Sequence, residues 1–161
     1  MNREERKKRL EHLLQERKKQ EEELHKEQQI TEILEVFHEK DKVDILDESE
    51  SDRITSNMTS CFPIAFWGRI DWEKVKNKLV LTSEDILTIP AVLSNLSLDI
   101  SVPVYLIAGE YNSPVVKTSL STILENVEAV MYMGPDQWIY GPDLKYIIEF
   151  CHDGVITIGW I

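Results

Sequence analysis

Long apolar runs and cysteine are both scarce in this chain of 161 residues. The longest apolar stretches, such as 104–108 and 129–133, hold about five residues, whereas a helix needs roughly 20 to cross a bilayer. The two cysteines, Cys61 and Cys151, are too few for a disulfide framework, and the charged N-terminus lacks the apolar centre of a secretory signal. We therefore expect a reduced, cytoplasmic protein without a membrane partner.

The sequence motifs of common enzymes are missing too. There is no glycine-rich phosphate loop, no H-E-x-x-H, no G-x-S-x-G and no C-x-x-C, and the six glycines are too dispersed to cradle a nucleotide. Of the four histidines, His12 and His25 lie in a highly charged segment and His38 at its end, which does not suggest a ligand set. We expect no catalytic residue, no cofactor and no metal ion.

Basic residues are outnumbered, with 18 Lys and Arg against 29 Asp and Glu and a formal net charge of −11. Residues 1–42 hold 11 basic and 12 acidic residues, and residues 43–161 hold 7 and 17, so almost all the negative charge lies after position 42. This balance argues against direct binding to nucleic acid and favours a basic protein as partner.

The first 60 residues contain no glycine, proline or tryptophan. Strong helix formers fill the segment 2–40, and oppositely charged residues recur three to five positions apart, which predicts a long exposed helix over residues 1–42. Its apolar stripe is a broken heptad formed by Leu10, Leu13, Leu14 and Leu24. The sequence therefore leaves two alternatives: residues 1–42 mediate self-association, or they form a helix that is exposed to solvent.

The end of this helix carries a fuller apolar face at Ile30, Ile33, Leu34 and Phe37. We expect the segment 30–38 to dock on the chain's own domain, with a partner groove as the alternative. Residues 43–60 combine acidic and hydroxyl side chains with few apolar ones, which predicts a flexible acidic linker.

Residues 61–161 hold 53 apolar residues and all the glycine and proline, so they form the globular domain. Apolar runs predict strands at 62–70, 104–108, 129–133, 137–140, 144–151 and 155–161. Helical spacing predicts helices at 71–79, from Thr82 with a break at Pro90, and from Ser113 to Val127. The expected fold class is α+β, a mostly antiparallel sheet with helices packed on it and one crossover between 104–108 and 129–133.

The Asp153-Gly154 pair predicts a hairpin with a two-residue turn, in which Glu149 lies opposite Ile158. In that register Cys151 and His152 point to opposite faces, which excludes a Cys-His dyad within the strand. Glu149 lies on an otherwise apolar face, so its carboxylate needs a partner, either Arg69 or Lys145. A general acid or base at Glu149 is the functional alternative.

Aromatic and acidic residues gather between 132 and 146, where two Gly-Pro turns flank Trp138 and Tyr140. Asp136 and Asp143 lie beside these aromatic residues, and Glu110 and Tyr111 follow another strand end. Such side chains suit a partner-binding patch for a basic protein. The alternative is that the aromatic side chains close the core at a sheet edge.

The segments WGRIDWEKVK (67–76) and YIIEFCHDGVITIGW (146–160) resemble small cytosolic immunity proteins of bacterial polymorphic toxin and contact-dependent growth inhibition systems. The resemblance implies a non-enzymatic protein that binds a cognate toxin domain, often a nuclease, and blocks its active site. An acidic domain fits a basic toxin. Two rival functions are a scaffold protein that uses the N-terminal helix and a small enzyme that uses Glu149, or Cys61 with His152.

Overall fold

The last three strands of the chain form the middle of the sheet. In the computed structural model, which describes residues 2–109 and 113–161, β5 (Asp136–Gly141), β6 (Tyr146–Cys151) and β7 (Val155–Trp160) pair side by side. β3 (Val104–Ala108), β4 (Val116–Thr118) and β1 (Asp44–Ile45) extend the sheet beyond β5. β2 (Asn77–Thr82) closes the other edge beside β7.

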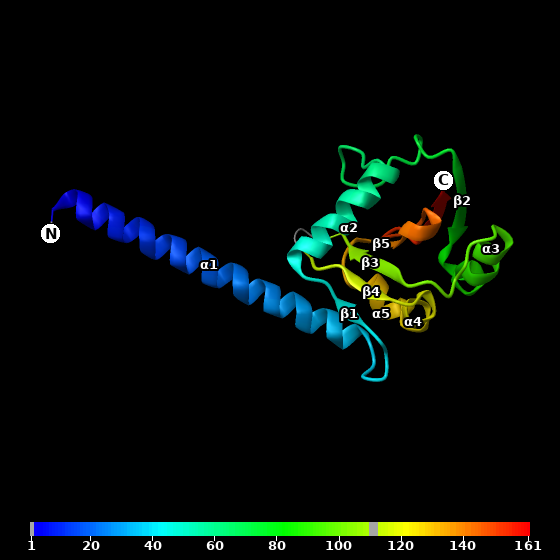
Figure 1. The fold of residues 1–161 in the computed structure, drawn as a ribbon, viewed down its shortest axis with the longest axis horizontal. Helices are drawn as coiled ribbons and strands as arrows, with labels where there is room; N and C mark the ends of the chain where they lie inside the picture. Colours follow the sequence, from blue (N-terminus) through cyan, green and yellow to red (C-terminus); the bar gives the residue numbers. More distant parts are fainter. Residues whose placement is uncertain (1, 110–112) are drawn as a thin grey trace.

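The strand order is β1-β4-β3-β5-β6-β7-β2, and every pairing between described strands is antiparallel. Helices cover both faces (Figure 1): α2 (Glu48–Cys61) lies on one, and α4 (Leu120–Glu125) and α5 (Val127–Met131) lie on the other. α3 (Ile89–Asn95) and the end of α1 (Arg3–Val36) pack on the same side as α4. The predicted α+β class is confirmed.

The two faces of the sheet bury separate cores because strand side chains alternate. In β6, Tyr146, Ile148 and Phe150 point toward α4, and Ile147 points toward α2. All six residues of β6 are buried, so the strand has no solvent-facing side. Glu149 and Cys151, which share the face of Ile147, therefore lie inside the protein.

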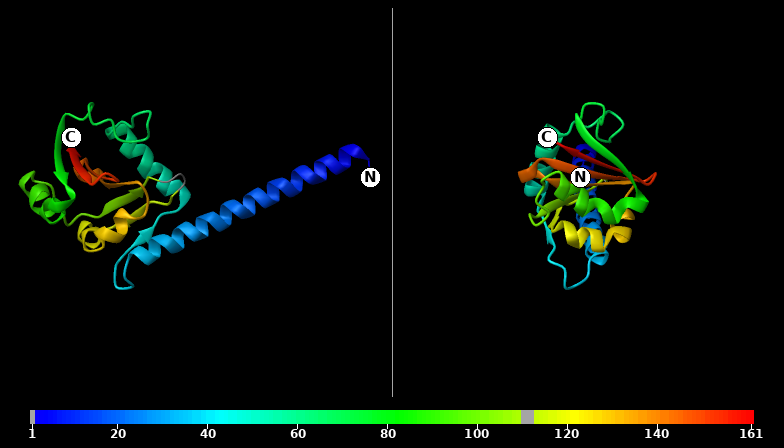
Figure 2. Two further views of the ribbon diagram at one scale, coloured as in Figure 1. Left: turned by 180° about the vertical axis from the view of Figure 1, so that it is seen from behind. Right: turned by 90° about the vertical axis from the view of Figure 1, so that its right-hand side faces the viewer.

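The predicted N-terminal helix is present as α1, which extends away from the domain (Figure 2). It begins with a capping box between Asn2 and Glu5. The docking segment is correct in part, since Ile33 and Phe37 enter the core, whereas Ile30 and Leu34 stay exposed. Among the helices of the described chain, none combines the length and apolar character needed to span a membrane.

The flexible linker expected over 43–60 is wrong, because the structure has β1 and α2 there. The Asp47 side chain caps α2 by accepting a hydrogen bond from the Glu50 amide. Ile54 and Met58, four residues apart, are buried against the sheet. Two apolar residues at helical spacing are enough to dock a helix that is otherwise polar.

The strand expected at 62–70 is a loop closed by a single bridge between Ile64 and Ile70. The helix expected at 71–79 is wrong as well, because residues 72–74 form a turn and Leu79 belongs to β2. β2 is an edge strand with mostly exposed side chains, so its sequence carries no alternating burial pattern. After it, η1 (Ser83–Thr88) has the predicted capping box between Thr82 and Asp85, and Pro90 lies in the first turn of α3.

The helix expected from Ser113 begins later, at Leu120, with Ser119 as its N-cap, and β4 occupies 116–118. The strand expected at 129–133 is helix α5. Among the described strands there is therefore no parallel crossover between 104–108 and 129–133, and β3 pairs with β5 instead.

The terminal hairpin is present, but its register differs by one residue from the prediction. Glu149 lies opposite Thr157 rather than Ile158, because the connection is three residues long, His152, Asp153 and Gly154. Gly154 has a φ of 83°, and its amide donates to the Cys151 carbonyl, as in a turn that ends in a left-handed glycine. A one-residue shift moves every side chain of β7 to the other face.

Candidate functional site

Glu149 is fully buried, and four donors surround its carboxylate. Oε1 accepts from Arg69 Nη2 at 2.8 Å and from Trp72 Nε1 at 2.9 Å. Oε2 accepts from Trp138 Nε1 at 2.8 Å and from the Ile70 amide at 3.4 Å. The cost of removing a carboxylate from water is offset only by such a set of partners. The arrangement leaves no free lone pair directed at a substrate, which favours a structural role.

Arg69 is the basic partner, one of the two that the sequence suggests. Burial works to lower the pKa of its guanidinium, but the hydrogen bond and the charge of Glu149 outweigh burial and raise it. Lys145, the other candidate, is exposed and adopts a left-handed backbone conformation just before β6. Arg69 joins the loop after α2 to the centre of the sheet through this ion pair.

Two tryptophan rings complete the shell around Glu149. A Cβ atom on Gly159 would lie 2.6 Å from the Trp72 ring, so the absence of a side chain on β7 makes room for this indole. Trp138 reaches the carboxylate from β5, opposite Glu149 in the ladder. The sequence does not indicate either indole as a ligand of the carboxylate.

The predicted aromatic patch is not on the surface. Trp138 is buried, and Tyr140 is fully buried and donates its hydroxyl to Asn57 on α2. Burial is the main cause that raises the pKa of the Tyr140 phenol. Both residues lie on a strand that is covered on both faces, which supports the alternative that they close the core. Asp143 is exposed in η2 (Pro142–Leu144), and Glu110 and Tyr111 lie outside the described residues.

An aromatic pair is exposed on the loop that carries Arg69. Phe66 and Trp67 keep 97% and 61% of their surfaces accessible, and their rings contact edge to face with centroids 4.7 Å apart. We call these two residues the aromatic tip. The Ala65 amide donates to the Arg69 carbonyl at 2.7 Å, and the Gly68 amide donates to the Ala65 carbonyl at 2.9 Å. The tip is therefore displayed on a tight turn, for which Gly68 supplies a φ of 87°.

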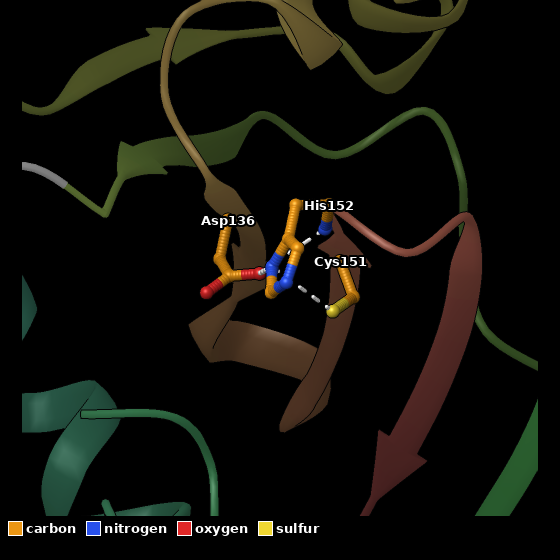
Figure 3. Close-up of side chains that lie close together, drawn as sticks. All are labelled: Asp136, Cys151 and His152. Atoms are coloured by element: carbon orange, nitrogen blue, oxygen red, sulfur yellow. Dashed lines mark hydrogen bonds and ion pairs between the residues drawn. The ribbon is translucent and has the colours of Figure 1, made fainter. Parts of the chain in front are cut away.

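Asp136, Cys151 and His152 form a second cluster (Figure 3). The charge of Arg69 acts on Asp136 and Cys151 in this cluster. His152 Nδ1 lies 3.1 Å from Asp136 Oδ1 and 3.6 Å from Cys151 Sγ. Burial works to raise the pKa of Asp136, but hydrogen bonds from His152 and Cys151 outweigh it and hold the pKa below 3.8. The prediction that Cys151 and His152 point to opposite faces of one strand is wrong, because β6 ends at Cys151 and the His152 ring folds back from the turn.

This cluster lacks the features of a nucleophilic cysteine site. Burial raises the pKa of the Cys151 thiol to about 12, which keeps it protonated. In a catalytic Cys-His-Asp arrangement, one ring nitrogen of the histidine contacts the sulfur and the other contacts the carboxylate. Here His152 Nδ1 is the nitrogen that faces both groups. Cys61, the other predicted nucleophile, has its sulfur 3.7 Å from the Tyr140 hydroxyl.

Comparison with known proteins gives one family. A family model described as CdiI immunity protein, EcoliA0-like, matches residues 30–159. This range includes the last part of α1, the sheet except for the last residue of β7, and both clusters described above. No curated protein matches the chain.

Proposed function

The chain belongs to the CdiI immunity protein family, and on this premise we propose how it neutralises a toxin. It binds a cognate toxin domain, a basic nuclease, and occludes the active site with an acidic surface that surrounds exposed aromatic side chains. The protein acts in the cytoplasm without catalysis and without direct contact to nucleic acid.

The charge distribution supports a basic toxin. Residues 43–161 hold 17 acidic and 7 basic residues, so the domain that the family model covers carries most of the net charge of −11. Nucleases hold a polyanion and present positive potential around their active sites. A domain of opposite sign associates quickly with such a surface and competes with the nucleic acid for it.

The aromatic tip is the observation that carries the proposed binding surface. Phe66 and Trp67 lie outside both hydrophobic cores, yet the loop holds them by backbone hydrogen bonds and by the Arg69–Glu149 pair. Exposed aromatic side chains on an ordered loop are the side chains that supply most of the energy in protein interfaces. Two acids lie nearby, since the charge of Arg69 contributes to lowering the pKa of both Asp136 and Asp153.

The test is neutralisation of the cognate toxin domain. We expect Trp67→Ala to weaken binding by about 2 kcal/mol, roughly 30-fold in Kd, and to reduce protection of cells that express the toxin. The matched control is Leu87→Ala, because Leu87 is another apolar side chain with 89% of its surface exposed. Equal loss of affinity in both variants, or no loss in Trp67→Ala, would refute the tip as the binding surface.

The protruding part of α1 (Figure 1) favours a second function, oligomerisation or docking to another partner. Leu10, Leu13, Leu14 and Leu24 are all more than half exposed on this helix. The family match begins only at residue 30. A variant that lacks residues 1–25 keeps the docked end of α1 intact. If α1 mediates self-association, light scattering gives fewer subunits per particle for this variant than for the full chain; an unchanged number of subunits excludes that role.

A further inference from the structure

Three potential metal ligands of different chemistry converge at one end of the central strands (Figure 3). Asp136 begins β5, Cys151 ends β6, and His152 is the first residue of the turn to β7. Their ligand atoms all lie within 4.8 Å of one another. The sequence does not predict this set, because the two-residue turn places Cys151 and His152 on opposite faces.

We propose that Asp136, Cys151 and His152 bind a zinc ion. In a tetrahedral site, a sulfur about 2.3 Å and a nitrogen about 2.0 Å from zinc lie roughly 3.5 Å apart. A nitrogen and an oxygen that are each about 2.0 Å from zinc lie roughly 3.3 Å apart. The observed separations are 3.6 Å between Cys151 Sγ and His152 Nδ1, and 3.1 Å between His152 Nδ1 and Asp136 Oδ1. Two of the three ligand pairs therefore already have separations close to those of a zinc site. The third pair, Cys151 Sγ and the Asp136 carboxylate, lies within 4.8 Å, and side-chain rotation must bring it to about 3.6 Å.

The surrounding charges favour a cation at this position. Asp136 contributes one negative charge and Asp153, which interacts with the Cys151 thiol, contributes a second. Arg69 is the positive group close to the cluster, and its charge is neutralised by the ion pair with Glu149. The local balance is negative before the metal binds.

Binding has a defined proton balance. The Cys151 thiol loses its proton to solvent and bonds to zinc as a thiolate, and His152 binds through Nδ1 with its proton on Nε2. The side chain of His152 is 64% exposed, so the fourth coordination position is open to water.

The chemistry of the donors selects the metal. Thiolate and imidazole ligands favour zinc and cobalt, whereas magnesium and calcium require oxygen ligands alone. The ion would connect the start of β5 to the β6–β7 turn, and the toxin-binding role proposed above does not depend on it.

The experiment is titration of the full chain with cobalt(II) chloride, followed by displacement with zinc. We expect one cobalt per chain, with a thiolate-to-cobalt charge-transfer absorption that disappears in Cys151→Ser. His152→Ala removes an exposed side chain, so it keeps the fold and weakens cobalt binding at least tenfold. Cys61→Ser is the matched control and retains the absorption, because Cys61 contacts Tyr140 instead of the cluster.

The proposal is overturned if the wild-type chain shows no charge-transfer absorption. It is also overturned if the absorption survives in Cys151→Ser or disappears in Cys61→Ser. A second measurement is the thermal midpoint, which zinc should raise in the wild-type chain and leave unchanged in His152→Ala. Toxin neutralisation is assayed separately without added metal, so failure of the zinc site and failure of the toxin-binding surface are distinguishable.

Discussion

Replacing Glu149 by glutamine changes the charge at the centre of the sheet and almost nothing in volume. The amide oxygen of glutamine can accept from two of the four donors, and its NH₂ group then faces the other two. If the oxygen takes the position of Oε1, the NH₂ meets the Trp138 indole and the Ile70 amide. If it takes the position of Oε2, the NH₂ meets Arg69 and Trp72. Either orientation sets donor against donor.

We expect this substitution to cost about 3 kcal/mol in free energy of unfolding, the lower end for a buried charge pair that loses one partner. The lower end applies because Arg69 is partly exposed and can turn toward water. In urea unfolding, an m value of about 2 kcal/mol/M converts this cost to a midpoint lower by roughly 1.5 M. Trp72 and Trp138 both lose an acceptor, so their fluorescence reports the same change.

The matched control is Glu128→Gln, because Glu128 is exposed on α5 and lies outside the carboxylate network. The free energy of unfolding of this control should change by less than about 0.5 kcal/mol, as for ordinary surface substitutions. Equal midpoints for Glu149→Gln and Glu128→Gln would show that the four hydrogen bonds contribute no net stability, and the reasoning from the buried carboxylate would be refuted.

Two further predictions concern single side chains. Because hydrogen bonds hold the pKa of Asp136 below its ordinary value of 3.8, this carboxylate stabilises the fold above pH 3.8 and loses that contribution as the pH falls through the lower folded value. Unfolding of Asp136→Asn should therefore depend less on pH below 3.8 than unfolding of the wild type, and parallel curves would contradict the assignment. Gln29 is buried on α1, and its amide has no hydrogen-bond partner among the described residues. Gln29→Met should raise the free energy of unfolding by about 1 kcal/mol in urea, and a lower value would show that the amide is satisfied in solution.

The fully buried strands were predictable because their signal is local. β3, β5, β6 and β7 are apolar runs bounded by Gly, Pro or Asp, and their positions agree with the prediction to within two residues at each end. β2 was not predictable, since an exposed edge strand has no burial pattern and Val75 and Leu79 happen to have helical spacing. Ser113-Pro114 resembles a helix start, but the chain remains extended through β4, where Thr118 donates its hydroxyl to the Lys42 carbonyl near β1.

The candidate site was predictable only where burial forces a partner. A carboxylate on the apolar face of a central strand needs a base, which limits the choice to few residues and includes Arg69. The sequence could not decide whether Trp138 and Tyr140 are exposed or buried, because it does not reveal that helix α2 covers that face of the sheet. The cluster of Asp136, Cys151 and His152 depends on a turn that is one residue longer than the Asp-Gly pair suggests.

The hydrogen bonds to Glu149 hold the loop that carries the aromatic tip. Arg69 and Ile70 are consecutive residues, both donate to the same carboxylate, and the tip lies directly before them. A hydrophobic residue at position 149 would fill the space but could not hold the Ile70 amide and the guanidinium, so the loop would lose its connection to β6. An ordered loop has less conformational entropy to lose when it binds. A buried ion pair adds little net stability in comparison with apolar residues of the same volume. The geometry of the loop that Glu149 maintains therefore explains why a charge lies at this position.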